Sequence, residues 1–169
     1  GYLYYDKGSL AGLMLDIMIR DASNNRQSLD DVMRSVYQSA YKQNRGFTGA
    51  EWWAAVSKAA GGKSFSDFNR LYIAALSIGL ARAAFEPSVT WVRERQAFGQ
   101  PLARHQATGF KVARMSLEID ASSTLLARAC AARDAGERST RLVSEAKLLA
   151  TEAAVRVTAD ALQLHGGLG

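Results

Sequence analysis

Apolar residues recur at helical spacing along most of the chain, and this periodicity restricts the fold more than any other feature of the sequence. In the second part of the chain, three long stretches keep this spacing, and each ends at a glycine-containing break. The middle stretch carries apolar residues on several faces, as expected of a helix at the centre of a bundle. The sequence therefore predicts an all-α fold with a three- or four-helix bundle. The three stretches cover about residues 70–98, 103–134 and 139–165.

Residues 1–68 show shorter helical patterns, and we predict that they form a small helical subdomain fused to the bundle of residues 69–169. Thr48 and Glu51 have the spacing of a capping box, which marks the start of a helix. A further helix, beginning near residue 64, can run straight into the first long helix of the bundle. The other two predicted helices of this subdomain cover about residues 9–20 and 28–41.

A tight corner at Phe98–Pro101 separates the first two long helical patterns. Glycine suits the position after a helix, and proline suits the first turn of the next one. We therefore predict that one helix ends and another begins at this corner. Pro87 lies inside the first long pattern, where its missing N–H should kink the helix near residues 83–85 or split it in two.

The charge distribution favours an anionic ligand. The formal charge is +5, and most of the excess lies in residues 69–169, which carry thirteen Lys/Arg and nine Asp/Glu. Net charge alone does not distinguish a phosphate-bearing cofactor from a nucleic acid as the ligand. The basic residues are scattered without interleaved aromatic residues, which disfavours nucleic acid. Neither His105 nor His165 has a partner at metal-ligand spacing, so we expect no metal site.

The single cysteine, Cys130, excludes an internal disulfide and fits a cytoplasmic protein. No apolar run reaches transmembrane length, so we expect no membrane partner. The first residues lack the order of a signal peptide, and the chain begins as if cut from a longer one.

Two spaced motifs, at residues 95–102 and 160–167, carry a family resemblance in the second part of the chain. The first contains Arg-x-x-Phe-Gly and the second Gln-x-x-Gly-Gly, and the pair is far more specific than either half. Through these motifs residues 69–169 resemble the C-terminal helical domain of the acyl-CoA dehydrogenases. The resemblance implies an FAD-dependent α,β-dehydrogenation of an acyl-CoA.

The same resemblance implies that this domain contacts the ADP portion of FAD, which a neighbouring subunit of a homo-oligomer mainly holds. Arginine pairs with pyrophosphate, glutamine forms hydrogen bonds, and glycine lets the backbone come close. Two weaker matches, Arg70 and Arg138, correspond to residues near the acyl thioester and the CoA phosphate. The implied FAD contacts are Arg95, Phe98, Gln106, Gln163, Gly166 and Gly167.

The catalytic set implied by the resemblance is incomplete in this chain. In the family a glutamate removes the α-proton, and its usual position falls beyond Gly169. In a minority of members it lies at the start of the first long helix, where this chain has Asn69, which cannot act as a base. We therefore expect no autonomous catalysis. The alternative is a functional dehydrogenase fragment that other domains or chains complete.

The first part of the chain carries different motifs, at residues 4–8, 28–33 and 46–48. They resemble the C-terminal helical subdomain of the glycyl aminopeptidase-type zinc metallopeptidases, the group that often carries a PDZ domain. In this resemblance Tyr5 matches a tyrosine whose hydroxyl stabilises an oxyanion. The zinc ligands that would accompany it are absent, so we expect neither zinc nor peptidase activity.

Taken together, the two resemblances describe a chimera joined near residues 68–69. Apolar helix faces that lost their native partners should pack on each other or on another copy of the chain. The leading interpretation is an oligomeric all-α chimera that carries an FAD half-site without autonomous activity. The dehydrogenase fragment and a basic helical module that binds nucleic acid remain the alternatives.

Overall fold

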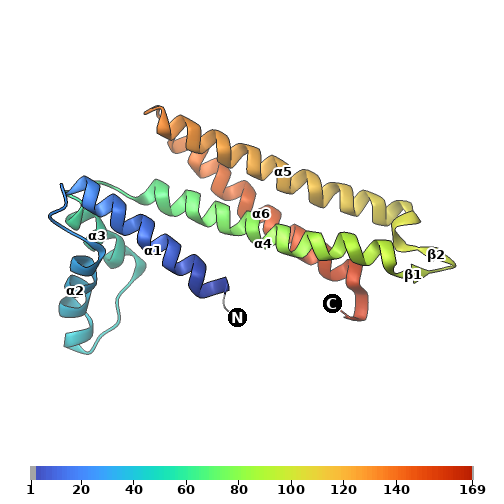
Figure 1. Ribbon diagram of the computed structural model, residues 1–169, viewed down its shortest axis with the longest axis horizontal. Helices are drawn as coiled ribbons and strands as arrows, with labels where there is room; N and C mark the ends of the chain where they lie inside the picture. The colour runs from blue at the N-terminus through green and yellow to red at the C-terminus, as the bar shows by residue number, and fades with distance from the viewer. Residues whose placement is uncertain (1–2, 169) are drawn as a thin grey trace. The chain divides into compact units, whose positions relative to one another are not determined.

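The computed structural model describes the backbone of residues 3–168 and the side chains of residues 9–167. It divides into two compact units, Gly1–Ser66 (unit 1) and Asp67–Gly169 (unit 2). Six α-helices, three short 3-10 helices and one two-stranded hairpin make up the regular structure of the described residues (Figure 1). The predicted all-α fold is confirmed. Within the same residues, no helix combines the length and the apolar character that crossing a membrane would require.

Unit 1 contains three α-helices, and each contributes one almost completely buried side chain. These side chains are Ile19 from α1, Val32 from α2 and Val56 from α3. The predicted capping box at α3 is confirmed, because Thr48 and Glu51 exchange backbone-to-side-chain hydrogen bonds of 2.7 and 3.2 Å. The elements are α1 (Leu3–Ala22), α2 (Leu29–Ser39), the 3-10 helix η1 (Tyr41–Gln43) and α3 (Gly49–Ala59).

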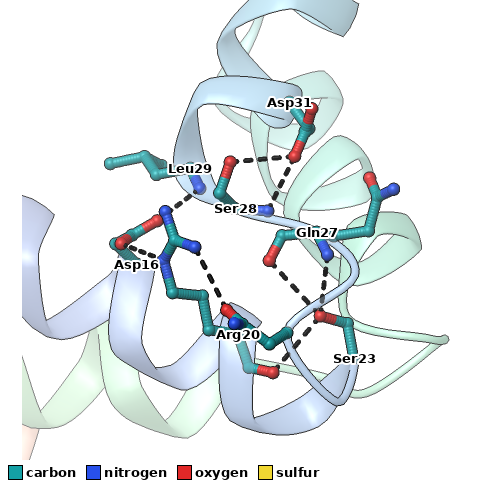
Figure 2. A network of polar contacts seen from close by, with 8 residues as sticks. Asp16, Arg20, Ser23, Gln27, Ser28, Leu29 and Asp31 are labelled. Carbon is teal, nitrogen blue, oxygen red and sulfur yellow. Dashed lines mark hydrogen bonds and ion pairs between the residues drawn. The ribbon is translucent and has the colours of Figure 1, made fainter.

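A carboxylate of α1 helps to cap α2 (Figure 2). The Asp16 side chain accepts a 2.7 Å bond from the N–H of Leu29, the first residue of α2, and a 2.7 Å bond from Nε of Arg20. The Asp31 carboxylate in turn accepts bonds from the N–H and the hydroxyl of Ser28. The first N–H groups of a helix have no partner inside that helix, so these bonds stabilise the start of α2 and tie it to α1.

Unit 2 is built on three long helices, α4 (Ser66–Glu94), α5 (Gln106–Asp134) and α6 (Thr140–His165), with a 3-10 turn, η3 (Gly166–Leu168), at the end. The helix α4 starts at the last residue of unit 1 and continues through Pro87. Of the two outcomes expected at Pro87, the split into two helices is therefore wrong, and the kink stays a prediction. Pro87 cannot donate to the carbonyl of Ala83, and both residues are exposed. Water can therefore solvate the carbonyl that proline leaves without a partner.

The core of unit 2 consists largely of small residues. On α6, Ala146 and Ala150 are completely buried, and Ala153 is 1% exposed. Small side chains let helices approach closely, and α5 and α6 pack along their lengths as antiparallel neighbours (Figure 1). The helix α4 adds Ala74, Ile78 and Ala81 to the same core, facing residues such as Met115, Ile119, Val157 and Ala161.

The corner between α4 and α5 is a β-hairpin, and this corrects the predicted helix-to-helix turn. Strand β1 (Gln96–Ala97) pairs antiparallel with β2 (Gln100–Pro101) around the turn Phe98-Gly99. A 3-10 turn, η2 (Leu102–Arg104), then leads into α5. Both turn residues have positive φ, 54° for Phe98 and 80° for Gly99, as a type I′ turn requires. Glycine and proline therefore serve a hairpin here. The helix α5 begins at Gln106, three residues after the start that the sequence pattern predicted.

Candidate functional site

The hairpin is held by bonds at its base and by His105. The N–H of Arg95 donates to the carbonyl of Trp91 at 2.8 Å, and the N–H of Leu102 donates to the carbonyl of Arg95 at 2.9 Å. The His105 ring lies 3.3 Å from the carbonyl oxygen of Ala97 through Nε2, and it meets the Phe98 ring edge-on at 6.0 Å. These contacts fix the direction in which the hairpin leaves α4.

Trp91 ties the end of α4 to the end of α6. Its indole N–H donates to the carbonyl of Leu164 at 3.1 Å, and its ring stacks on His165 with centroids 5.4 Å apart and planes at 19°. The guanidinium carbon of Arg95 lies 5.8 Å from the centroid of the same indole ring. One side chain thus positions both the cation at the start of the hairpin and the last turn of α6.

These contacts border a cleft of about 540 Å³ at the end of the bundle. It brings together three of the predicted cofactor contacts, Arg95, Gly166 and Gly167. The remaining lining residues are Trp91, Leu102, Leu164 and His165. The sequence separation across the cleft is about seventy residues, so only the helix packing creates it.

The cleft is open and positively charged where Arg95 enters it. Arg95 is exposed and forms no ion pair with any described residue, so its guanidinium is available to an anion. Gly166 has φ 65° and ψ −137°, a backbone conformation that a residue with a Cβ rarely adopts. The donor set and the bare backbone therefore suit a pyrophosphate or a similar anion.

The other three predicted cofactor contacts are exposed but do not line this cleft. Phe98 is at the tip of the hairpin, with 97% of its surface exposed. Gln106 is the first residue of α5, and Gln163 lies in the last turn of α6. All three belong to elements at the same end of unit 2 as the cleft (Figure 1).

The weaker predicted residues lie at the opposite end of α4. Arg70 is about 37 Å from Arg95 along the helix, at 1.5 Å per residue. Its guanidinium pairs with Asp67 at 3.4 Å, and Arg133 of α5 pairs with the same carboxylate at 2.9 Å. Asn69 is half-buried next to Arg70, and Arg138 is exposed in the loop between α5 and α6. The structure thus separates the two predicted sets of site residues.

Some residues fall outside these arrangements. The prediction for Tyr5 concerns a side chain outside the described ones, which begin at Ser9. Among the described residues, no group of three or more His, Cys, Asp or Glu side chains could hold a metal ion. Cys130 is half-buried, and burial raises the pKa of its thiol, which disfavours the reactive thiolate.

Sequence reasoning missed the role of Trp91. A tryptophan in a helical apolar pattern reads as a packing residue with its N–H at the surface. In the structure that N–H instead donates to Leu164, and the ring stacks on His165. The spacing of Trp91 and Arg95, four residues apart, could have indicated that they stack. No feature of the neighbouring sequence indicates that Trp91 also contacts α6.

Comparisons with known proteins identify the second part of the chain. Residues 63–169 match the family described as "Acyl-CoA dehydrogenase, C-terminal domain". Cyclohexane-1-carbonyl-CoA dehydrogenase of Geobacter metallireducens is 35% identical over 150 residues, which cover 89% of this chain and 36% of that protein. The short-chain specific mitochondrial acyl-CoA dehydrogenase of Bos taurus is 40% identical over 103 residues, 61% of this chain and 25% of the relative.

A solved structure shows the same similarity in three dimensions. Butyryl-CoA dehydrogenase from Megasphaera elsdenii superposes with a TM-score of 0.58 and 36% identity, over 60% of this chain and 26% of that one. The chain therefore spans only about a quarter to a third of the length of these relatives.

Proposed function

The chain belongs to the acyl-CoA dehydrogenase family through its residues 63–169, and from this premise we propose that unit 2 contributes one half of a site for FAD. The observation that carries the proposal is the cleft in which the hairpin's Arg95 meets Gly166 and Gly167. The other half of the site would come from the FAD-holding region of another chain.

The residues present fit the ADP portion of FAD. The unpaired guanidinium of Arg95 pairs with the pyrophosphate, and the backbone at Gly166 and Gly167 comes close to it without a side chain in the way. Phe98, fully exposed at the hairpin tip, packs on the cofactor or on the chain that holds it. Gln106 and Gln163 supply hydrogen bonds from the two neighbouring helix ends.

Catalysis by this chain alone is not part of the proposal. When bound, FAD would supply the hydride acceptor for an α,β-dehydrogenation of an acyl-CoA, which also needs a base for the α-proton. Asn69 cannot serve as that base. Arg70 and Arg138 are proposed only as contacts near the thioester and the CoA phosphate, at the far end of the bundle. The alternative is a functional dehydrogenase in which other domains or chains complete both sites.

We also propose assembly with a second copy of the chain, because apolar helix faces without a partner within one copy can pack on another copy. Light scattering of the purified chain tests it, and a monomer at all concentrations would contradict it.

A chimeric origin for unit 1 stays a prediction that rests on motif resemblance to metallopeptidases. The alignment with the Geobacter metallireducens relative extends into unit 1 and weighs against it. The cytoplasmic location also stays a prediction, and no relative named above is described as binding nucleic acid.

Titration with FAD and with ADP tests the half-site. The whole chain should bind both, and ADP should compete with FAD because the contacts are to the ADP portion. Arg95→Ala should weaken binding about 10- to 100-fold, since a hydrogen bond to a charged group contributes roughly 1.5–3 kcal/mol. The matched control is Arg93→Ala, because Arg93 is an exposed arginine in the last turn of α4 that does not line the cleft. Equal affinity of the two variants would contradict the proposal.

A further inference from the structure

Unit 1 contains a second cleft, of about 630 Å³, that the proposed half-site does not use. Its walls come from the loop after α1, the first half of α2 and the end of α3. A volume of this size falls in the range of small-molecule sites. Polar and apolar surface share the lining about equally, and two of its residues, Arg26 and Lys58, are basic.

The cleft lining carries two cations and one carboxylate, which leaves a net positive charge. Arg26 and Lys58 form no side-chain hydrogen bond or ion pair with the described part of the chain. Asp31 is the acidic residue among the described lining residues, and its carboxylate is already engaged. One oxygen accepts from the N–H and hydroxyl of Ser28, and the other pairs with Arg34 at 3.1 Å. The cation that Asp31 pairs with is thus Arg34, and neither Arg26 nor Lys58 bonds to its carboxylate.

Neutral donors complete the lining. Asn24, Gln27 and Ser35 also line the cleft, and their side chains have no hydrogen-bond partner among the described residues. An amide N–H and a hydroxyl donate to oxyanions without adding charge. Two cations with three neutral donors match an anion that carries several oxygens and more than one negative charge.

The wall formed by the α1–α2 loop is held in a defined shape. Ser23 bonds to both the N–H and the carbonyl of Gln27, at 3.0 and 3.3 Å, and Arg20 bonds to Asn25 at 3.1 Å (Figure 2). Asn24 adopts φ 51°, an uncommon conformation for a residue with a side chain. A preorganised wall lowers the entropy that a ligand must offset on binding.

We propose that this cleft binds a small multivalent oxyanion, with phosphate or carboxylate oxygens held between Arg26 and Lys58. The site is independent of the FAD half-site, which lies in unit 2. The cleft volume of about 630 Å³ limits the ligand to a small molecule. Phosphate and carboxylate groups share the chemistry that the cleft recognises, so the experiment must distinguish them.

Calorimetric titration of the whole chain with pyrophosphate and, separately, with citrate tests the proposal. The Arg95→Ala background removes the proposed phosphate contact of unit 2, so any binding that remains belongs elsewhere. Arg26→Gln with Lys58→Gln should lower the affinity for the better ligand at least tenfold, because both charges that face the anion are lost. Raising the salt concentration should weaken binding by the unmodified cleft. Pyrophosphate binding tighter than citrate binding identifies a phosphate ligand, and the reverse order identifies a carboxylate.

The matched control is Lys42→Gln with Lys63→Gln, which removes the same charge from unit 1 at exposed positions outside the cleft. This variant should bind like the Arg95→Ala background. Circular dichroism establishes that both double variants keep their helices. The proposal is overturned if neither anion binds, or if the cleft variant and the control lose affinity equally. Unchanged affinity in the folded cleft variant would overturn it as well.

Discussion

Trp91 should be the side chain on which the end of the unit 2 bundle most depends. Trp91→Phe keeps a ring that can stack on His165 but loses the 3.1 Å bond to Leu164. A net hydrogen bond contributes about 1 kcal/mol, so this variant should lower the free energy of unfolding by roughly that amount. Trp91→Ala also loses the stacking, worth about 0.5–1.5 kcal/mol, and the Arg95 contact, worth about 0.5–1 kcal/mol.

The total cost of Trp91→Ala includes these terms together with the lost burial. Large-to-small changes of a buried tryptophan cost about 3–5 kcal/mol, and Trp91 is only half-buried, so the lower end, about 3 kcal/mol, applies. Urea unfolding followed by circular dichroism measures both variants. Hydrogen exchange at the end of α6 locates the effect, because the clamp holds that turn and its loss should speed exchange there.

Two outcomes would refute the reasoning about Trp91. If Trp91→Ala changes the unfolding free energy by less than about 0.5 kcal/mol, the value typical of surface substitutions, the clamp contributes nothing. If Phe and Ala at this position are equally destabilising, the hydrogen bond carries the whole effect and the stack carries none. Trp53→Phe in unit 1 is the control, and it should leave exchange at the end of α6 unchanged.

Three further predictions concern packing, the hairpin and pH. Ala150→Leu should lower the unfolding free energy in urea by about 1–3 kcal/mol, because the site is completely buried where α5 and α6 pack. Phe98→Asn should raise it by up to about 1 kcal/mol, because asparagine tolerates positive φ and no buried surface is lost, while affinity for FAD should fall. In unit 1 the pKa values of Asp16, Asp31 and Glu51 are lowered, by bonds from Arg20, Ser28 and the N–H of Thr48 respectively. A carboxylate with a lowered pKa stabilises the fold above the ordinary carboxyl pKa of about 4, and this stabilisation is lost as pH falls through the pKa of the folded state. Tryptophan fluorescence in a Trp91→Phe background should therefore show unit 1 unfolding below about pH 4.

Local patterns were sufficient to predict most of the helices. Periodicity placed the three long helices of unit 2, and the Thr48–Glu51 spacing placed the start of α3, because both signals depend on residues within a turn or two of each other. The same logic predicted a kink or a split at Pro87, and the split did not occur. Whether water reaches the carbonyl of Ala83 depends on the folded surface around it, which local spacing does not specify.

The sequence by itself thus determined the all-α class and the residue types of the candidate half-site. The tertiary structure decided that the Phe98-Gly99 corner is a hairpin, since strand pairing and positive φ depend on how α4 and α5 are placed. It also decided that Arg95 shares a cleft with Gly166 and Gly167 and that Trp91 joins them. Those residues are about seventy positions apart, and only the packing of small side chains between the helices brings them together.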